Sequence, residues 1–172
     1  MNSYKKQLWE STEILRGRFK QKDYRKIIVP FVFFQRIDCL LKEDYAFNEI
    51  FTSIIPEISF GALFESDKVF SDAFVMYVES FDLEIQILLD KIGFMNLMTK
   101  MASDDRMLKD LYSVFSQINL SPNVVSDSEL VDAIKDPTDA EFSTPYDVSQ
   151  LLTSLVFSTK NHNIDFSNSN IK

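Results

Sequence analysis

Paired carboxylates are the residues of this sequence whose type and spacing come closest to a site for chemistry, because acidic pairs can bind a divalent metal. The pairs are Asp104 with Asp105, Asp127 with Glu129, and Asp136 with Asp139. Each pair lies beside a predicted helix end, where a carboxylate caps free amides or interacts favourably with the helix dipole. We therefore interpret all three pairs as solvated helix caps and predict no metal site.

Nucleophilic and cofactor chemistry have even fewer candidates. His162 is the only histidine, and it lies in a polar C-terminal stretch rather than between two partners of a Ser–His–acid relay. The 3 glycines are scattered singly, so they cannot build a Gly-rich loop around a phosphate or a dinucleotide. The sequence thus predicts no catalytic residue within this chain.

Cys39 is the only cysteine, which excludes an intramolecular disulfide and a cysteine-rich metal site and suits a reducing compartment. We predict that it is a small buried apolar residue rather than a reactive thiol. The first residues contain no apolar signal segment, and nowhere do roughly 18 apolar residues follow one another, as a membrane-spanning helix requires. A cytoplasmic protein without a membrane span is therefore expected.

Charge is distributed unevenly along the chain. The net charge is −8, which taken alone disfavours binding to nucleic acid. Residues 1–26 nevertheless hold eight lysines and arginines against three acidic residues, or 8 − 3 = +5, which leaves −13 for the remainder. This basic end is either a solvated helix face and loop or a local edge that faces phosphates.

The elements that would position these residues are predicted to be helices. The chain has 16 phenylalanines but only 3 glycines and 5 prolines, a composition that favours helices over a many-stranded sheet. Apolar residues recur at helical spacing from Phe81 to Ile92 and from Met107 to Ile118. We predict an all-α fold, a compact bundle of about six to eight helices, with a disordered C-terminal tail rich in Asn and Ser.

Several helix boundaries follow from local signals. Gly17 is expected to end the first helix near the position of a left-handed cap. Ser126 and Glu129 have the spacing of a capping box and open a short helix. In "YRKIIVPFVFFQRIDCLL", length favours a buried helix, with a kink or a locally broken turn at Pro30.

The stretch "EFSTPYDVSQLL" carries the strongest signal for the start of a helix. Thr144 can cap the free amides, Pro145 suits the first helical position, and Asp147 places a carboxylate in the positive first turn. The apolar residues that follow share one helical face. This helix must therefore pack against another part of a protein.

Several motifs occur in the order typical of one protein family. Trp9 is followed by Leu15-Arg16-Gly17, by Tyr24, and by an apolar helix that ends in Arg36 and Ile37-Asp38. "FDLEIQILLDKIGFMNLM" and "INLSPNVVSDSELVDAI" come next, and "EFSTP" closes the series. In these motifs the sequence resembles the N-terminal part of the modification (M) subunit of type I restriction–modification systems. This subunit is an N6-adenine DNA methyltransferase.

The resemblance implies a division of the chain. Residues 1–140 would form a non-catalytic N-terminal helical domain, 141–158 the first helix of a truncated methyltransferase domain, and 159–172 a flexible tail. By resemblance, Glu141, Phe142, Thr144 and Pro145 would contact S-adenosylmethionine, but only with a complete methyltransferase domain. No cofactor is expected in this chain, because neither a Gly-rich cofactor loop nor an Asn-Pro-Pro-aromatic motif follows.

The resemblance also implies partners. The module would assemble with the specificity (S) subunit and with M subunits, with the R subunit as a further candidate, and would help to clamp DNA. Five basic residues would then contact the DNA backbone weakly: Arg16, Arg18, Lys20, Lys22 and Arg25. The alternative is a free-standing helical interaction protein, a decoy or regulator derived from this module. An enzyme complete within these residues is the least favoured hypothesis.

Overall fold

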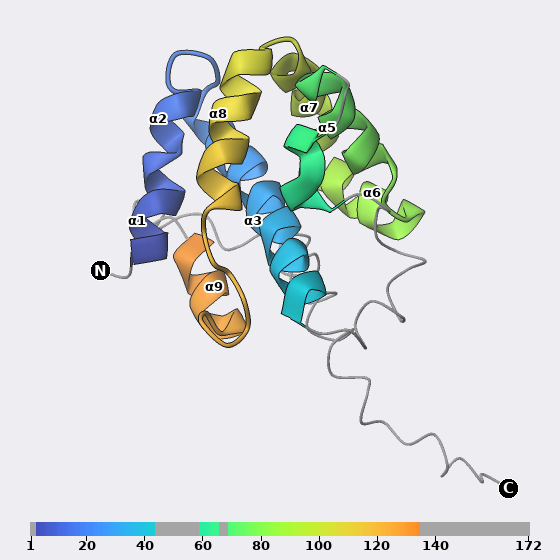
Figure 1. Ribbon diagram of the computed structural model, residues 1–172. Helices are drawn as coiled ribbons and strands as arrows, with labels where there is room; N and C mark the ends of the chain where they lie inside the picture. Colours follow the sequence, from blue (N-terminus) through green and yellow to red (C-terminus); the bar gives the residue numbers. More distant parts are fainter. Residues whose placement is uncertain (1–2, 44–58, 66–68, 135–172) are drawn as a thin grey trace, which may run out of the picture.

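Residues 3–43, 59–65 and 69–134 are described by the computed structural model (Figure 1). Every element in these ranges is helical, so the predicted all-α class is confirmed for this part of the chain. The elements are α1 (Ser3–Glu10), α2 (Thr12–Leu15), α3 (Gln21–Glu43), the 3-10 helix η1 (Phe60–Glu65), α5 (Phe70–Glu79), α6 (Leu83–Lys91), α7 (Phe94–Ala102), α8 (Asp105–Ser116) and α9 (Asp127–Ile134).

Helix α3 is the central element. It packs against α2, α7, α8, α9 and η1, and Figure 1 shows it running between the helices of both halves of the bundle. Every residue from Ile27 to Leu40 is buried, which explains why the sequence there lacks a polar face. Although α3 is 23 residues long, neither it nor any other described helix is apolar enough over its length to cross a membrane.

Phenylalanine rings fill the space around α3. The ring centroid of Phe31 lies 5.3 Å from that of Phe74 on α5 and 5.2 Å from that of Phe115 on α8. Phe34 stacks on Phe81, between α5 and α6, at 5.5 Å. Aromatic pairs at these separations add attraction beyond their area burial. The rings therefore join α3 to segments that lie 43 to 84 positions away in the sequence.

Helix α3 continues without interruption through Pro30. The predicted alternative of a broken turn is therefore wrong, although a proline in a helix interior costs about 3 kcal/mol. Phe31, Phe33 and Phe34 follow directly and are fully buried. At roughly 1.5–3 kcal/mol for each buried side chain, their burial exceeds the cost of the proline.

The predicted helix boundaries are largely confirmed. Gly17 has a φ of +77°, and α2 ends two residues before it. The amide of Ser126 donates to Glu129 Oε2 at 3.0 Å and the amide of Glu129 donates to Ser126 Oγ at 3.4 Å, which is the reciprocal pattern of a capping box. The first predicted helix is instead divided at Ser11, whose hydroxyl donates to a backbone carbonyl in the preceding turn.

Arg36 on α3 is buried and fixes the connection between α8 and α9. Its guanidinium donates to the carbonyl oxygens of Leu120 and Val125, the latter at 2.9 Å, and to Asp127 Oδ1 at 2.7 Å. Beside it, the amide nitrogen of Gln35 donates to the carbonyl of Ile118 at 2.8 Å. The connection between α8 and α9 is a non-helical segment of ten residues. Gln35 and Arg36 supply hydrogen-bond donors to three of its backbone carbonyls, as buried carbonyls require.

Asp38, also buried on α3, fixes the start of η1. Its Oδ1 accepts a hydrogen bond from the amide of Gly61 at 3.0 Å, and its Oδ2 pairs with Lys42 at 2.6 Å. The hydroxyl of Tyr112 on α8 donates to the carbonyl of Gly61 at 2.8 Å. One glycine thus receives contacts from α3 and α8, and the buried charge of Asp38 has both a neutralising cation and a hydrogen bond.

Candidate nucleic-acid interface

The loop between α2 and α3 exposes the first residues of the predicted basic end. Leu15 and Phe19 are buried and anchor the loop, and the amides of Arg18 and Phe19 donate to the carbonyl of Leu15 at 3.1 and 3.0 Å. Gly17, between Leu15 and Phe19, has a positive φ, a conformation that a residue without Cβ adopts at low cost. Arg16 and Arg18 on either side of Gly17 are exposed.

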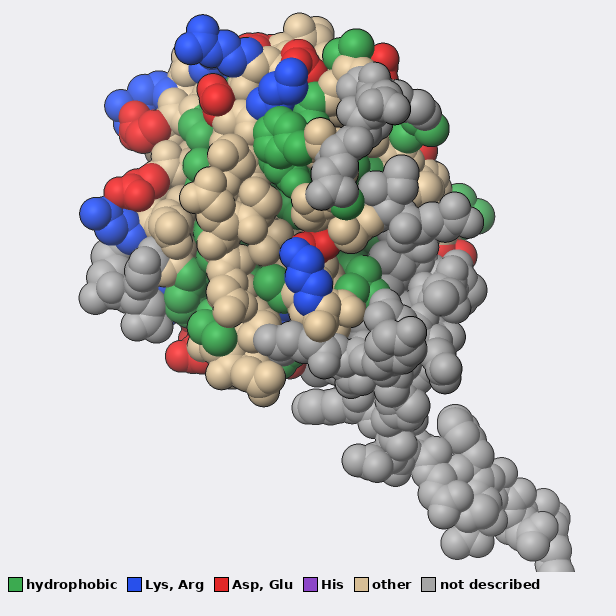
Figure 2. Space-filling model, in the orientation of Figure 1, with side chains coloured by type: hydrophobic (Ala, Val, Ile, Leu, Met, Phe, Trp, Pro, Cys, Tyr) green, Lys and Arg blue, Asp and Glu red, His purple; other side chains and the backbone are tan. Residues whose placement is uncertain are grey.

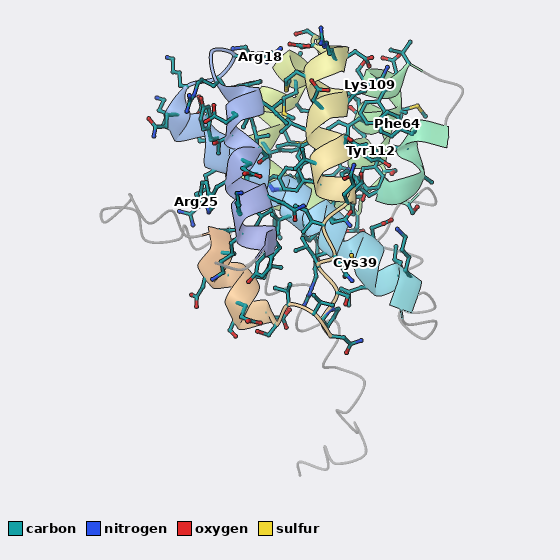
Figure 3. All side chains as sticks on the ribbon, turned by 60° about the vertical axis from the view of Figure 1, so that its left-hand side comes forward. Arg18, Arg25, Cys39, Phe64, Lys109 and Tyr112 are labelled. Atoms are coloured by element: carbon teal, nitrogen blue, oxygen red, sulfur yellow. The ribbon has the colours of Figure 1, made fainter. Side chains whose placement is uncertain are left out.

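Arg18 ties this loop to the start of α8. Its Nε donates to Asp104 Oδ2 at 2.9 Å, and its Nη1 donates to the carbonyl of Ile14 at 3.0 Å. Asp104 is also the N-cap of α8, because its Oδ1 accepts from the amide of Met107 at 3.0 Å. The Met107 amide, and then the Arg18 guanidinium, hold the pKa of Asp104 below its usual value. Figure 3 shows Arg18 at the end of the bundle where α8 begins.

Two further basic residues reach the same end of the bundle, from the last turn of α7 and the first turn of α8. Lys100 Nζ donates to the carbonyl of Arg18 at 2.6 Å and lies 4.7 Å from the ring centroid of Phe19, a cation–π contact. Arg106 is exposed two positions after Asp104 and contributes to the lowering of its pKa. Sequence reasoning missed both residues, because Lys100 lies 82 positions from Arg18 and no local signal links them.

The other residues predicted to contact the DNA backbone differ in exposure and in ion pairing. Arg16 pairs with Glu13 at 2.5 Å on the exposed surface, whereas Lys20 and Lys22 are exposed in the loop and in the first turn of α3. The pKa of Asp23 is lowered mainly by its hydrogen bond from Lys26, and the charges of Lys22 and Lys20 lower it further. Arg25 is half-buried and lies lower along the bundle than Arg18 in Figure 3.

We define the basic edge as the exposed cations that the structure places around the α2–α3 loop and the start of α8: Arg16, Arg18, Lys20, Lys22, Lys100 and Arg106. Blue side chains lie at the upper left of Figure 2, interleaved with red ones, where Figure 1 places α2 and the following loop. Such an edge can attract phosphates through long-range electrostatics, and contacts of this kind position a nucleic acid without reading its sequence.

The residues predicted to meet a cofactor, Glu141, Phe142, Thr144 and Pro145, lie outside the described residues, as does His162. Cys39 is buried and free, as predicted, and burial raises the pKa of its thiol. In the described ranges, no group of three or more His, Cys, Asp or Glu side chains could hold a metal ion.

One comparison with known proteins gives a match. The family model described as "HsdM N-terminal domain" matches residues 4–156, which is most of the chain. The matched range includes Trp9, Arg36, Asp38 and the Glu-Phe-x-Thr-Pro motif. No curated protein and no solved structure matches the chain.

Proposed function

The chain belongs to the HsdM N-terminal domain family, the N-terminal domain of the M subunit of type I restriction–modification systems, and on this premise we propose that it is an assembly and DNA-clamping module. It would assemble with the S subunit and with M subunits, the R subunit being a further candidate, and would close around DNA while leaving methyl transfer to another domain. Its own contribution would be to hold the duplex by the phosphate backbone.

The observation that carries this proposal is the basic edge. Residues 1–26 have a net charge of +5 in a chain of −8, and the fold adds Lys100 and Arg106 to the same end of the bundle. Acidic surfaces elsewhere repel a polyanion, so DNA would approach this end in preference to the others. With few phosphate contacts and an unfavourable net charge, binding by this chain alone should be weak, and protein partners would have to hold the clamp closed.

S-adenosylmethionine enters the proposal only through the segment that follows the described residues. Within the described part, Gly17 and Gly93 are single glycines at positive φ in turns, and Gly61 faces the Asp38 carboxylate. They do not fit a cofactor loop, which needs several glycines in one loop beside a helix start. Contact of Glu141, Phe142, Thr144 and Pro145 with the cofactor therefore depends on a methyltransferase domain, and no catalytic step is assigned to this chain.

Salt-dependent DNA binding tests the role of the basic edge. Fluorescence anisotropy with a labelled DNA duplex, titrated with the full chain at several salt concentrations, gives the slope of log K against log salt. Lys20→Ala/Lys22→Ala should weaken binding and reduce the magnitude of that slope by roughly 2, because about one counterion is released for each phosphate contact. The two lysines are exposed, so their replacement should leave folding intact.

Lys6→Ala/Lys109→Ala is the matched control, because it removes two exposed or half-exposed cations that form local pairs on α1 and α8. An equal loss of affinity in both double variants would mean that DNA responds only to net charge. Binding that does not change with salt would contradict the proposed phosphate contacts altogether.

A further inference from the structure

Apolar side chains are exposed along α5 and α6, on the side of the bundle away from α1 and α2 (Figure 1). Val69, Met76, Leu83 and Ile87 keep between 46% and 68% of their surface exposed. These are four of the six large hydrophobic residues that are exposed in the described part of the chain. Single exposed hydrophobic residues are ordinary, but a concentration on two consecutive helices marks an interaction surface.

These residues lie on the outer faces of the two helices. On α5 the buried residues include Phe70, Phe74 and Tyr77, whereas Met76 is exposed on the opposite side; Val69, the N-cap residue before α5, is exposed as well. On α6, Ile85 and Leu89 face the core, and Leu83 and Ile87 do not. The spacing of four residues places Leu83 and Ile87 on one face of α6.

A short turn joins the end of α5 to the start of α6, and both helices pack against α7. Ser80 and Phe81 belong to this turn, and the side-chain amide of Gln86 on α6 donates to the carbonyl of Glu79 at 2.8 Å and to that of Phe81 at 2.7 Å. The first turns of α6 are thereby fixed against the end of α5. We call the outer surface of both helices the α5–α6 face.

Exposed carboxylates surround the apolar residues of this face. They are Asp72, Glu79, Asp82, Glu84 and Asp90, and the sequence contains no Lys or Arg between Val69 and Asp90. None of these five forms an ion pair with a described Lys or Arg, whereas seven carboxylates elsewhere in the described part do. Green and red side chains are visible at the right-hand margin of Figure 2, where Figure 1 places α5 and α6.

We infer that the α5–α6 face binds a cationic amphipathic segment of a partner protein. Such a segment would place apolar side chains against Val69, Met76, Leu83 and Ile87, and its lysines or arginines would pair with the surrounding carboxylates. The acidic rim repels phosphates, which excludes nucleic acid as the occupant. A second copy of the chain is disfavoured, because pairing two identical faces would bring ten unneutralised carboxylates together.

This inference extends the proposed assembly role by giving the chemistry of the partner, but it can be tested without DNA. The probe is a synthetic helical peptide with leucines at helical spacing on one face and lysines beside them. Titration of the full chain into the labelled peptide should show saturable binding. Leu83→Gln and Met76→Gln should each lower the affinity about tenfold, as expected for central apolar contacts.

Val124→Gln is the matched control for the apolar contacts, because Val124 is equally exposed but lies between α8 and α9. Glu79→Gln/Glu84→Gln should lower both the affinity and its salt dependence, and Glu10→Gln/Glu13→Gln, which removes two paired carboxylates on the other side of the molecule, should change neither. Circular dichroism would check that each variant keeps its helices.

Equal effects of the face variants and their controls would overturn the inference, because the peptide would then respond only to the net charge. Sedimentation of the chain alone provides the second decisive measurement. A dimer that Leu83→Gln dissociates would assign the face to a second copy and would also overturn the inference. Neither result bears on the salt-dependent DNA binding of the basic edge, so the two proposals can fail separately.

Discussion

The two ends of α3 carry charge in opposite ways. Before and within its first turn, Arg18, Lys20 and Lys22 are exposed, and the contacts of Arg18 lie at the surface. Towards its other end, Arg36 and Asp38 are almost fully buried and hold three other segments in place. The same residue types therefore serve a possible partner at one end and the fold at the other.

The difference shows that solvent exposure, and not residue type, decides what an arginine contributes. An exposed ion pair gains little, since water and salt screen it. A buried guanidinium has lost its hydration, and fixed hydrogen-bond acceptors must compensate for that loss. Removing the guanidinium leaves those acceptors without a donor and therefore destabilises the fold. Substitutions in the basic edge should consequently cost this chain little stability, whereas substitutions of the buried residues should cost more.

Replacing each arginine by methionine tests this contrast most strongly. Arg36→Met leaves the carbonyls of Leu120 and Val125 without their donor, and we expect it to lower the free energy of unfolding by about 3–5 kcal/mol. Arg18→Met should cost less than about 1 kcal/mol, because its pair with Asp104 is exposed on both sides. Urea unfolding followed by circular dichroism measures both.

Asp127→Asn separates the ion pair of Arg36 from its hydrogen bonds to the carbonyls of Leu120 and Val125. Asp127 is 47% exposed, so its loss of charge should cost far less than the loss of Arg36. If Arg36→Met proved no more damaging than Arg18→Met, the buried guanidinium would not be what orders the connection between α8 and α9.

Two glycines allow a similar comparison with smaller effects. A Cβ added at Gly61 would lie 2.9 Å from Asp38 Oδ2, a buried atom that cannot move freely, and we expect Gly61→Ala to cost about 1–3 kcal/mol. A Cβ at Gly17 would meet nothing within 4 Å, so Gly17→Ala should cost only the strain of positive φ, about 1 kcal/mol.

Thermal unfolding of the two alanine variants measures the difference. Gly61→Ala should have the lower midpoint temperature. The opposite order would mean that Asp38 can move aside without cost, and that the attachment of η1 to α3 is not rigid.

Much of the fold could be predicted because its signals are local. The Ser126–Glu129 capping box and the helix end near Gly17 depend on residues a few positions apart, and both were found. The pairing of Arg18 with Asp104 spans 86 positions and could not be. For the same reason Lys100 was missed, although its ammonium group hydrogen-bonds to the loop that contains several of the predicted DNA contacts.

The partners of the buried charges were also not predictable. The apolar run around Arg36 predicts that its helix is buried, but nothing adjacent in the sequence identifies the carbonyls of Leu120 and Val125, 84 and 89 positions away, that accept from its guanidinium. The α5–α6 face escaped detection in the same way, because Leu83 and Ile87 are of the residue types that fill the core.

The Asp104 carboxylate gives the smallest but most specific test, because it neutralises a cation of the basic edge. Asp104→Asn keeps a side chain that caps helices well and removes the charge opposite Arg18. The free energy of unfolding at neutral pH should change by less than about 1 kcal/mol. Affinity for a DNA duplex should rise about threefold, because Arg18 no longer has to leave a carboxylate to meet a phosphate.

The pH dependence and a matched variant distinguish this effect from a general change in charge. Because the folded pKa of Asp104 lies below its ordinary value of 3.8, the stability that it contributes is present above 3.8 and is lost as the pH falls through the folded pKa. Asp104→Asn should therefore lose less stability than the unmodified chain on acidification. Asp110→Asn removes an exposed charge from the same helix and should leave DNA affinity nearly unchanged. Equal gains in both variants would show that Arg18 is not a site of phosphate contact.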